Sequence, residues 1–253
     1  MKRYWEIDVF RGFAILCMVV FHSFFIVVFF GIVSIDLWSG FFWWFPRVIA
    51  AAFLFTAGLS LTISYSKSNN KSFKKFLIRG LKIFGLGMIL TAITFTGLLV
   101  LQNITGYVQI TKVIYFGILH CIGISLIAGY FFLNRRILSF ITGIAVMIVG
   151  FSINDMRFDF PWLFWLGFWP DGYYPIDYEP LLPWMGPVLL GIAFGNTVYK
   201  NGMRPAFIRE LNRDLISGLL RGAAFLGRHS LIIYLCHVPV LAGIIFCINW
   251  LIS

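Results

Sequence analysis

The sequence is poor in charge, since only 12% of its 253 residues are Asp, Glu, Lys or Arg while 60% are hydrophobic. Soluble domains average about 25% charged residues because they need a polar surface. The mean hydropathy is +0.90, and the long apolar runs leave no such surface here. We therefore expect an integral membrane protein covered mostly by lipid. No linker or change in composition divides the chain, so residues 1–253 are predicted to form a single integral-membrane domain.

Cysteine and the common catalytic motifs are also scarce. The four cysteines all lie inside apolar segments, where buried free thiols are expected in place of disulfides or a zinc site. The chain has no glycine-rich nucleotide loop, no Gly-x-Ser-x-Gly elbow and no His-Glu-x-x-His motif. We therefore predict no metal site, and we look for chemistry among ionisable residues within the apolar segments.

Long apolar runs are abundant, and a membrane-spanning helix needs about 20 such residues. Seven runs approach that length: Val9–Gly31, Trp43–Tyr65, Ile78–Leu101, Val113–Leu133, Ile137–Ile153, Leu181–Tyr199 and Ser230–Leu251. They predict an all-α fold, a polytopic membrane helix bundle of about seven transmembrane helices. Small residues on the faces of these helices would permit a homodimer.

Basic residues gather in alternate segments between these runs. Seventeen of the 20 fall on one predicted side: Lys2, Arg3, Arg11, Lys67, Lys71, Lys74, Lys75, Arg79, Lys82, Arg135, Arg136, Lys200, Arg204, Arg209, Arg213, Arg221 and Arg228. The positive-inside rule makes that side, and the N-terminus, cytoplasmic. The net charge of +10 is then a topology signal, and we expect no nucleic-acid partner. A multi-pass protein of the plasma membrane is predicted.

Two segments outside the runs have their own patterns. The outer segment Asn154–Pro180 is dense in Trp, Tyr and Phe, as in the aromatic belts at membrane interfaces, and is predicted to form a lid or rim. The inner segment 200–230 mixes basic and apolar residues at helical spacing, which predicts a helix lying in the interface.

Ionisable residues occur within the first run, "IDVFRGFAILCMVVFH". Arg11 and His22 are eleven residues apart, about 16 Å along one face of a helix, and Asp8 lies one turn before Arg11. Arg11 alone could be snorkelling to the headgroups, but His22 lies too deep for that. The pattern suggests a cationic group for a cytosolic anion at one end of the helix and a titratable imidazole at the other.

Three further residues complete the candidate set. His120 is predicted about two turns below the outer surface, and His237 about two turns above the inner one. Either could also be a packed, hydrogen-bonded structural histidine. Asp177, in "DYEPLLPWMG", stands at the outer mouth before a span. It is either a solvated loop carboxylate or a group that orients a polar acceptor.

Four blocks carry a resemblance to a known family: "IDVFRGFAILCMVVFH", "YFGILHCIGISLIAGY", "DYEPLLPWMGPVLLGIAFG" and "LGRHSLIIYLCHVPVL". In this order they resemble the heparan-alpha-glucosaminide N-acetyltransferase-like family of small prokaryotic membrane proteins. The Arg and His of the first helix are also similar to the motif of the related type 3 membrane acyltransferases. The resemblance implies an acyltransferase that takes an acyl group, commonly acetyl, from a cytosolic acyl-CoA such as acetyl-CoA. It implies that the group is given to a hydroxyl or amine acceptor, such as a sugar, at the outer face.

The resemblance also suggests roles for individual residues. His22, His120 and Asp177 become candidate catalytic residues, and Arg11, Arg228, Asp8 and His237 become candidates for binding CoA. The lysosomal branch of the family has a catalytic histidine in the loop after the first helix. Here that loop, Ile32–Phe41, offers only Asp36, so His22 is the favoured catalytic histidine.

Two other functions fit the same residues. Intramembrane histidines on facing helices, such as His22 and His120, could ligate a haem in an electron-transfer protein. A proton-coupled transporter could use His22, His120 and Asp177 as a relay. The chain shows no evident inverted repeat, which makes the transporter the weaker alternative.

Overall fold

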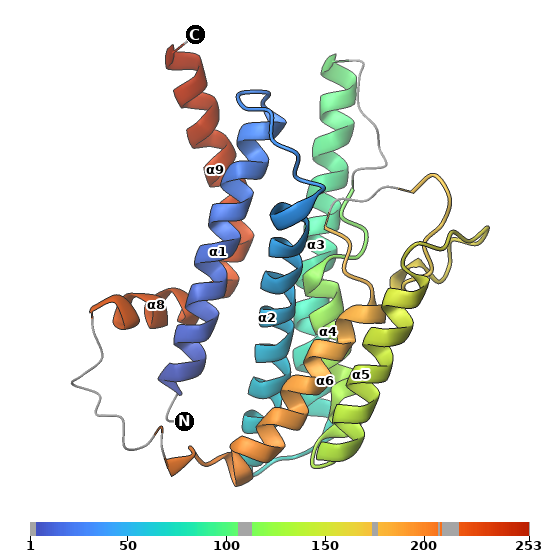
Figure 1. Ribbon diagram of the computed structural model, residues 1–253, viewed down its shortest axis with the longest axis vertical. Coiled ribbons are helices and arrows are strands. Elements are labelled where there is room, and N and C mark those ends of the chain that lie inside the picture. The colour runs from blue at the N-terminus through green and yellow to red at the C-terminus, as the bar shows by residue number, and fades with distance from the viewer. Residues whose placement is uncertain (1–3, 106–112, 174–176, 207, 209–217, 253) are drawn as a thin grey trace. The chain divides into compact units, whose positions relative to one another are not determined.

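A computed structural model describes residues 4–105, 113–173, 177–206, 208 and 218–252. These residues form helices joined by loops and short 3₁₀ turns, as predicted (Figure 1). In the described part, six helices are long and apolar enough to cross a membrane, and Ile118–Phe132 forms a shorter apolar helix. Each of the seven predicted runs therefore contains a helix, and six of these helices have the length of a membrane span. Helices are favoured in lipid because they satisfy their own backbone hydrogen bonds.

The described residues group into two compact units. Unit 1 comprises residues 1–53 and 206–253, and unit 2 comprises residues 54–205. The long helix α2 (Gly40–Ser66) contributes residues to both. Each unit is described below by itself.

Unit 1 is built around α1 (Trp5–Phe29), which packs against α8 (Gly218–Arg228) and α9 (Ser230–Ile252). Figure 1 shows α8 lying across α1, whereas α9 runs beside it. Its core includes Ile15, Met18 and Ile49. The predicted interfacial helix corresponds to α8. Residues 207 and 209–217 of the same segment, which include Arg209 and Arg213, lie outside the described residues. Lys2 and Arg3 also lie outside them.

Glycines set the crossing of α1 and α8. A Cβ at Gly12 would collide with the backbone of Ala223, and a Cβ at Gly227 would collide with the carbonyl oxygen of Asp8. The two backbones therefore touch, which only residues without a side chain allow. This contact holds α8, and the arginines on it, against the first part of α1.

Unit 2 contains α3 (Phe73–Thr105), α4 (Ile118–Gly129), α5 (Arg136–Ile153) and α6 (Leu181–Val198), with short 3₁₀ turns at Tyr130–Phe132, Phe164–Leu166 and Lys200–Gly202. α6 packs on α4 and α5, and α3 packs on α4. The pair Gly191 and Gly195 lies on α6 against α2, where a Cβ would meet Phe55 and Thr62. The small-residue pair therefore serves helix packing.

Basic segments gather at one end of unit 2. The hydroxyl of Tyr130 donates to the carbonyl of Lys71 at 3.0 Å, and Gly202 lies against the side chains of Lys67 and Ser66. The ends of α2, α4 and α6 and the starts of α3 and α5 therefore meet. This clustering is the arrangement that the charge alternation predicts for unit 2.

The fourth predicted span is shorter than expected, because its helix begins at Ile118 and not at Val113. The five preceding residues are not helical, yet Val113 and Phe116 are buried. Irregular backbone at such depth needs hydrogen-bond partners from the protein. Thr91 donates its hydroxyl to the carbonyl of Ile114 at 2.6 Å, and the N–H of Glu179 donates to the carbonyl of Phe116 at 2.9 Å.

Candidate functional site

In unit 1, two of the predicted histidines are in contact. The ring of His22 on α1 lies 4.7 Å from the ring of His237 on α9, centroid to centroid, with the two planes at 82°. His237 is buried and His22 is half-buried, and Phe21 packs edge-on against His22. The site is therefore a pair of imidazoles between α1 and α9.

The hydrogen bonds of this pair define where a proton can be taken up. Nδ1 of His22 lies 2.9 Å from the carbonyl oxygen of Met18, and Nδ1 of His237 lies 2.7 Å from that of Tyr234. Because a carbonyl oxygen can only accept, each Nδ1 must carry the hydrogen and donate it. In a neutral ring Nε2 then holds the lone pair. Both imidazoles are thus oriented with Nε2 as the basic atom.

The contact corrects the predicted depths of these two residues. The sequence predicts His237 about two turns above the inner surface and His22 about 16 Å along the first helix from the cytoplasmic Arg11, but touching rings must lie at similar depth. The depth of His237 follows from where α9 starts relative to α1, and that start depends on how α8 crosses α1. No local pattern in the sequence carries that information.

Asp8, Arg11 and Arg228 lie in the region where α1 meets α8. The Asp8 carbonyl faces Gly227, Arg11 is one turn further along α1 and half-buried, and Arg228 is exposed at the end of α8. The Arg228 side chain donates from Nε to the Ala224 carbonyl at 3.3 Å. We call Arg11, Arg221 and Arg228 the basic corner of unit 1. It lies about 16 Å along α1 from His22, by helix rise.

In unit 2, His120 sits in the first turn of α4 and uses both ring nitrogens. The N–H of Gly117 donates to Nδ1 at 3.2 Å, and Nε2 lies 3.4 Å from the hydroxyl oxygen of Thr91. That hydroxyl donates its own hydrogen to Ile114, so Nε2–H of His120 is the donor to Thr91. His120 is only 1% exposed. This bonding favours a role in holding the start of α4, and its catalytic role stays a prediction.

Asp177 lies beside this turn. A Cβ on Gly117 would stand 2.6 Å from Oδ2 of Asp177, so the carboxylate is next to the backbone that binds His120. Asp177 has a φ of +54°, a left-handed conformation that Asp tolerates better than most residues. The bond from Glu179 N–H to the Phe116 carbonyl fastens the same loop to the start of α4. Unit 2 therefore brings His120 and Asp177 together.

The aromatic segment that the sequence predicts on the outer side is folded rather than extended, over its described residues 154–173 and 177–180. Phe158 pairs with Pro170 through an isolated β-bridge, and the Tyr178 hydroxyl donates to the Phe164 carbonyl. Burial raises the pKa of Tyr173 and of Tyr178, so both hydroxyls keep their hydrogens at neutral pH. The described part of this segment is thus a packed aromatic layer, and its role as a lid or rim stays a prediction. Residues 174–176 lie outside the described residues.

Sequence reasoning missed three participants. Met18 and Tyr234 supply the carbonyls that orient His22 and His237, and Thr91 binds His120. A carbonyl acceptor has no side-chain signal. Thr91 stands in an apolar run, and only its placement opposite α4 shows its role.

Comparison with known proteins identifies the family. A family model described as heparan-alpha-glucosaminide N-acetyltransferase, catalytic, matches residues 3–239 of the 253-residue chain. No curated protein and no solved structure gives a match. The family model implies a multi-pass membrane acetyltransferase with acetyl-CoA as the donor. Because the match covers most of the chain and both units, the protein belongs to the heparan-alpha-glucosaminide N-acetyltransferase family.

Proposed function

We propose that the protein moves an acetyl group from cytosolic acetyl-CoA to a hydroxyl or amine acceptor, such as a sugar, at the outer face of the plasma membrane. The observation that carries the proposal is the contact between His22 and His237, with both Nδ1 atoms bound to carbonyls. The proposed reaction is acyl transfer from a thioester, with the N-terminus and the basic corner on the cytoplasmic side.

Acyl transfer from a thioester to a hydroxyl or amine requires a base near the thioester carbonyl. As the acceptor oxygen or nitrogen attacks that carbon, Nε2 of His22 takes the acceptor's proton, the carbon–sulfur bond breaks, and the proton passes to the CoA sulfur. His237, in ring contact, is placed to stabilise the charge or to share the proton. His22 could instead carry the acetyl group transiently, and trapping a labelled acetyl-enzyme would separate the two routes.

The basic corner supplies the counter-charge for CoA. Its arginines can hold phosphates through charge-assisted hydrogen bonds, to which the planar guanidinium is well suited. Acetyl-CoA bound there would extend along α1 towards the histidine pair. Asp8, one turn before Arg11 on α1, would orient Arg11.

We expect the double substitution Arg11→Gln with Arg228→Gln to weaken acetyl-CoA binding at least about tenfold, since charged hydrogen bonds each contribute about 1.5–3 kcal/mol. Isothermal titration of the purified protein with acetyl-CoA at low salt measures this. The matched control is Arg157→Gln, an exposed arginine on the opposite predicted face, which should leave the Kd unchanged. An unchanged Kd in the double variant would place the donor elsewhere.

On the acceptor side, we expect Asp177→Asn to raise the acceptor KM or lower turnover while leaving acetyl-CoA affinity unchanged. A carboxylate held beside Gly117 can accept hydrogens from a sugar or amine with little reorganisation, and the amide accepts fewer. The control is Asp155→Asn, an exposed outer aspartate bonded to Asn154. Equal losses of donor binding and transfer would show that Asp177 supports the fold, and unchanged transfer would make it a surface charge.

The family assignment favours acetyl transfer over the haem and transporter alternatives. The deciding assay is transfer of labelled acetate from acetyl-CoA to a panel of amino sugars and sugar alcohols by the purified full chain. A Soret band in that preparation, with no transfer, would support the haem protein instead.

A further inference from the structure

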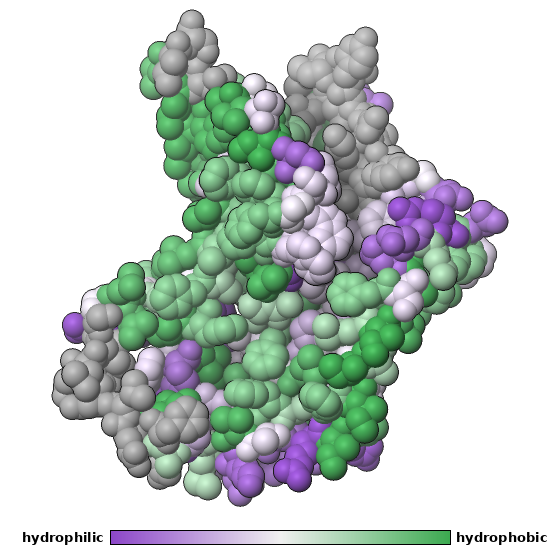
Figure 2. Space-filling view, viewed as in Figure 1, coloured by the Kyte–Doolittle hydropathy of each residue, from purple (hydrophilic) through white to green (hydrophobic). Residues whose placement is uncertain are grey.

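A polar pocket of about 270 Å³ lies at the basic end of unit 2. Seven residues line it: Ser66, Asn134, Arg136, Asn196, Tyr199, Lys200 and Asn201. Both charged members are cations, and among the described residues no carboxylate lines it. Figure 2 shows hydrophilic surface gathered where α5 and α6 meet this end, and hydrophobic surface along α5.

The lining has the chemistry of an anion site. Arg136 and Lys200 provide charged donors, and three side-chain amides and two hydroxyls provide neutral ones. The amide Nδ2 of Asn196 is buried and has no hydrogen-bond partner among the described residues. α5 also begins at Arg136 without a side-chain cap and without an acidic residue in its first turn, so its N-terminal N–H groups favour an anion. A phosphate oxygen would satisfy these donors.

The pocket lies at the ends of three helices long and apolar enough to span a membrane, which is where such helices are expected to leave it. Ser66 is the last residue of α2, Arg136 the first of α5, and Asn196 lies in the last turn of α6. Lipid phosphates occupy this level of a bilayer. Asn134, Arg136 and Lys200 are exposed, so the pocket opens to the molecular surface.

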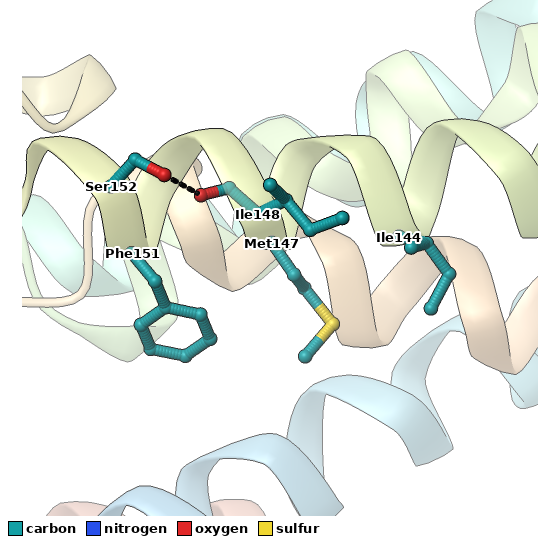
Figure 3. A pocket seen from close by; sticks show the side chains of 5 residues that line it. All are labelled: Ile144, Met147, Ile148, Phe151 and Ser152. Carbon is teal, nitrogen blue, oxygen red and sulfur yellow. Dashed lines mark hydrogen bonds between the residues drawn. The ribbon is translucent and has the colours of Figure 1, made fainter.

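A separate apolar depression lies further along the same helix, α5. It is about 490 Å³ and is lined by Ile144, Met147, Ile148, Phe151 and Ser152 (Figure 3). The Ser152 hydroxyl donates its hydrogen to the Ile148 carbonyl at 2.9 Å, so the side chains of this surface offer a ligand no hydrogen-bond donor. Figure 3 shows Met147 and Phe151 projecting from one side of α5.

Arg136 lies on the side of α5 that carries Ile144, Met147 and Phe151 of this depression, since positions 136, 140, 144, 147 and 151 repeat at three or four residues. Ile144 and Met147 lie about 12 and 16 Å along the axis from Arg136. Half of the hydrocarbon core is about 15 Å thick. An acyl chain attached to a phosphate at Arg136 would therefore reach the near part of the depression.

We propose that unit 2 holds a specific binding site for an anionic phospholipid, with the phosphate in the polar pocket and one acyl chain along the Arg136–Phe151 face of α5. A cationic pocket and an apolar depression about 12 Å apart along one helix fit the two parts of a lipid, which a soluble anion does not have. The site is separate from acetyl transfer and does not rest on the proposed function.

The test uses the full chain, delipidated in detergent, with native mass spectrometry to count bound lipid. We expect saturable binding of phosphatidylglycerol, and at least tenfold weaker binding of phosphatidylcholine with the same acyl chains. Arg136→Gln with Lys200→Gln should weaken phosphatidylglycerol binding at least tenfold. The matched control, Arg135→Gln with Lys74→Gln, removes two exposed charges from residues that do not line the pocket and should leave binding within twofold.

A second variant distinguishes a loss of lipid binding from a loss of folding. Asn196→Leu removes an amide nitrogen that no described residue binds, so the melting temperature should not fall, while phosphatidylglycerol binding weakens severalfold. Equal lipid losses in the matched control, or unchanged binding in both pocket variants, would overturn the site. If deacylated glycerophosphoglycerol or inorganic phosphate binds as tightly as the lipid, the pocket takes a soluble phosphate and the lipid proposal fails.

Discussion

Replacing His22 with alanine is expected to lower acetyl transfer at least about 10³-fold, the loss typical of a missing general base that also orients its partner. The reason is geometric. His22 holds its Nδ1 hydrogen on the Met18 carbonyl, which leaves Nε2 as the base, and it contacts His237. Acetyl-CoA binding should stay within about tenfold, because the phosphates are expected about 16 Å away along α1.

The measurement pairs single-turnover transfer with acetyl-CoA titration on the same preparations. His229→Ala is the matched control, because His229 is an exposed histidine at the junction of α8 and α9 and should leave transfer unchanged. Near-normal turnover in His22→Ala would reject the assignment and make His120 the next candidate. Acid-quenched samples with labelled acetyl-CoA would show protein-bound label only if His22 carries the acetyl group.

Replacing Gly227 with alanine is expected to destabilise unit 1 by about 3 kcal/mol, the upper range for overpacking. The new Cβ would collide with the Asp8 carbonyl oxygen and approach the Gly12 nitrogen at 2.9 Å. Backbone cannot move aside as a flexible side chain can, so α8 must shift on α1. That shift displaces Arg228 and should weaken acetyl-CoA binding as well.

Gly222→Ala on the same helix gives a matched control with the opposite sign. A Cβ there meets nothing within 4 Å, and alanine is favoured over glycine in a helix interior by about 1 kcal/mol. Thermal melting of both variants in detergent, with acetyl-CoA titration, decides the matter. If Gly227→Ala melts no lower than Gly222→Ala, then α8 does not dock tightly on α1.

The transmembrane helices could be read from the sequence because the apolar length of a span is a local property. The first run became α1 and the last became α9, with bounds differing by a few residues. The start of α4 could not be read that way. Residues 113–117 are as apolar as the helix they precede, but Thr91 and Glu179, from distant segments, bind their carbonyls and stabilise an irregular turn.

The candidate site likewise has features that depend on local sequence and features that depend on contacts between distant segments. The sequence alone showed that His22, His120 and His237 lie within apolar segments, because the residue type and the apolar neighbours of each position are given by the sequence itself. It also assigned a spacing to Arg11 and His22, because both lie on one helix. It could not show that His22 meets His237, because their relative depth depends on the crossing of α8 over α1.

By itself, then, the sequence determined the helical membrane fold, the alternation of basic segments and the family blocks, all of which depend on local composition and order. The tertiary structure decided how the ring nitrogens of each histidine are bonded, and that bonding supports the proposal that His22 is the base. A ring nitrogen is basic or engaged according to its neighbour. Met18 and Tyr234 accept from Nδ1 of the His22–His237 pair, whereas Gly117 donates to His120 and Thr91 accepts from it. Those neighbours are determined by packing between helices, and no single segment of the sequence specifies that packing.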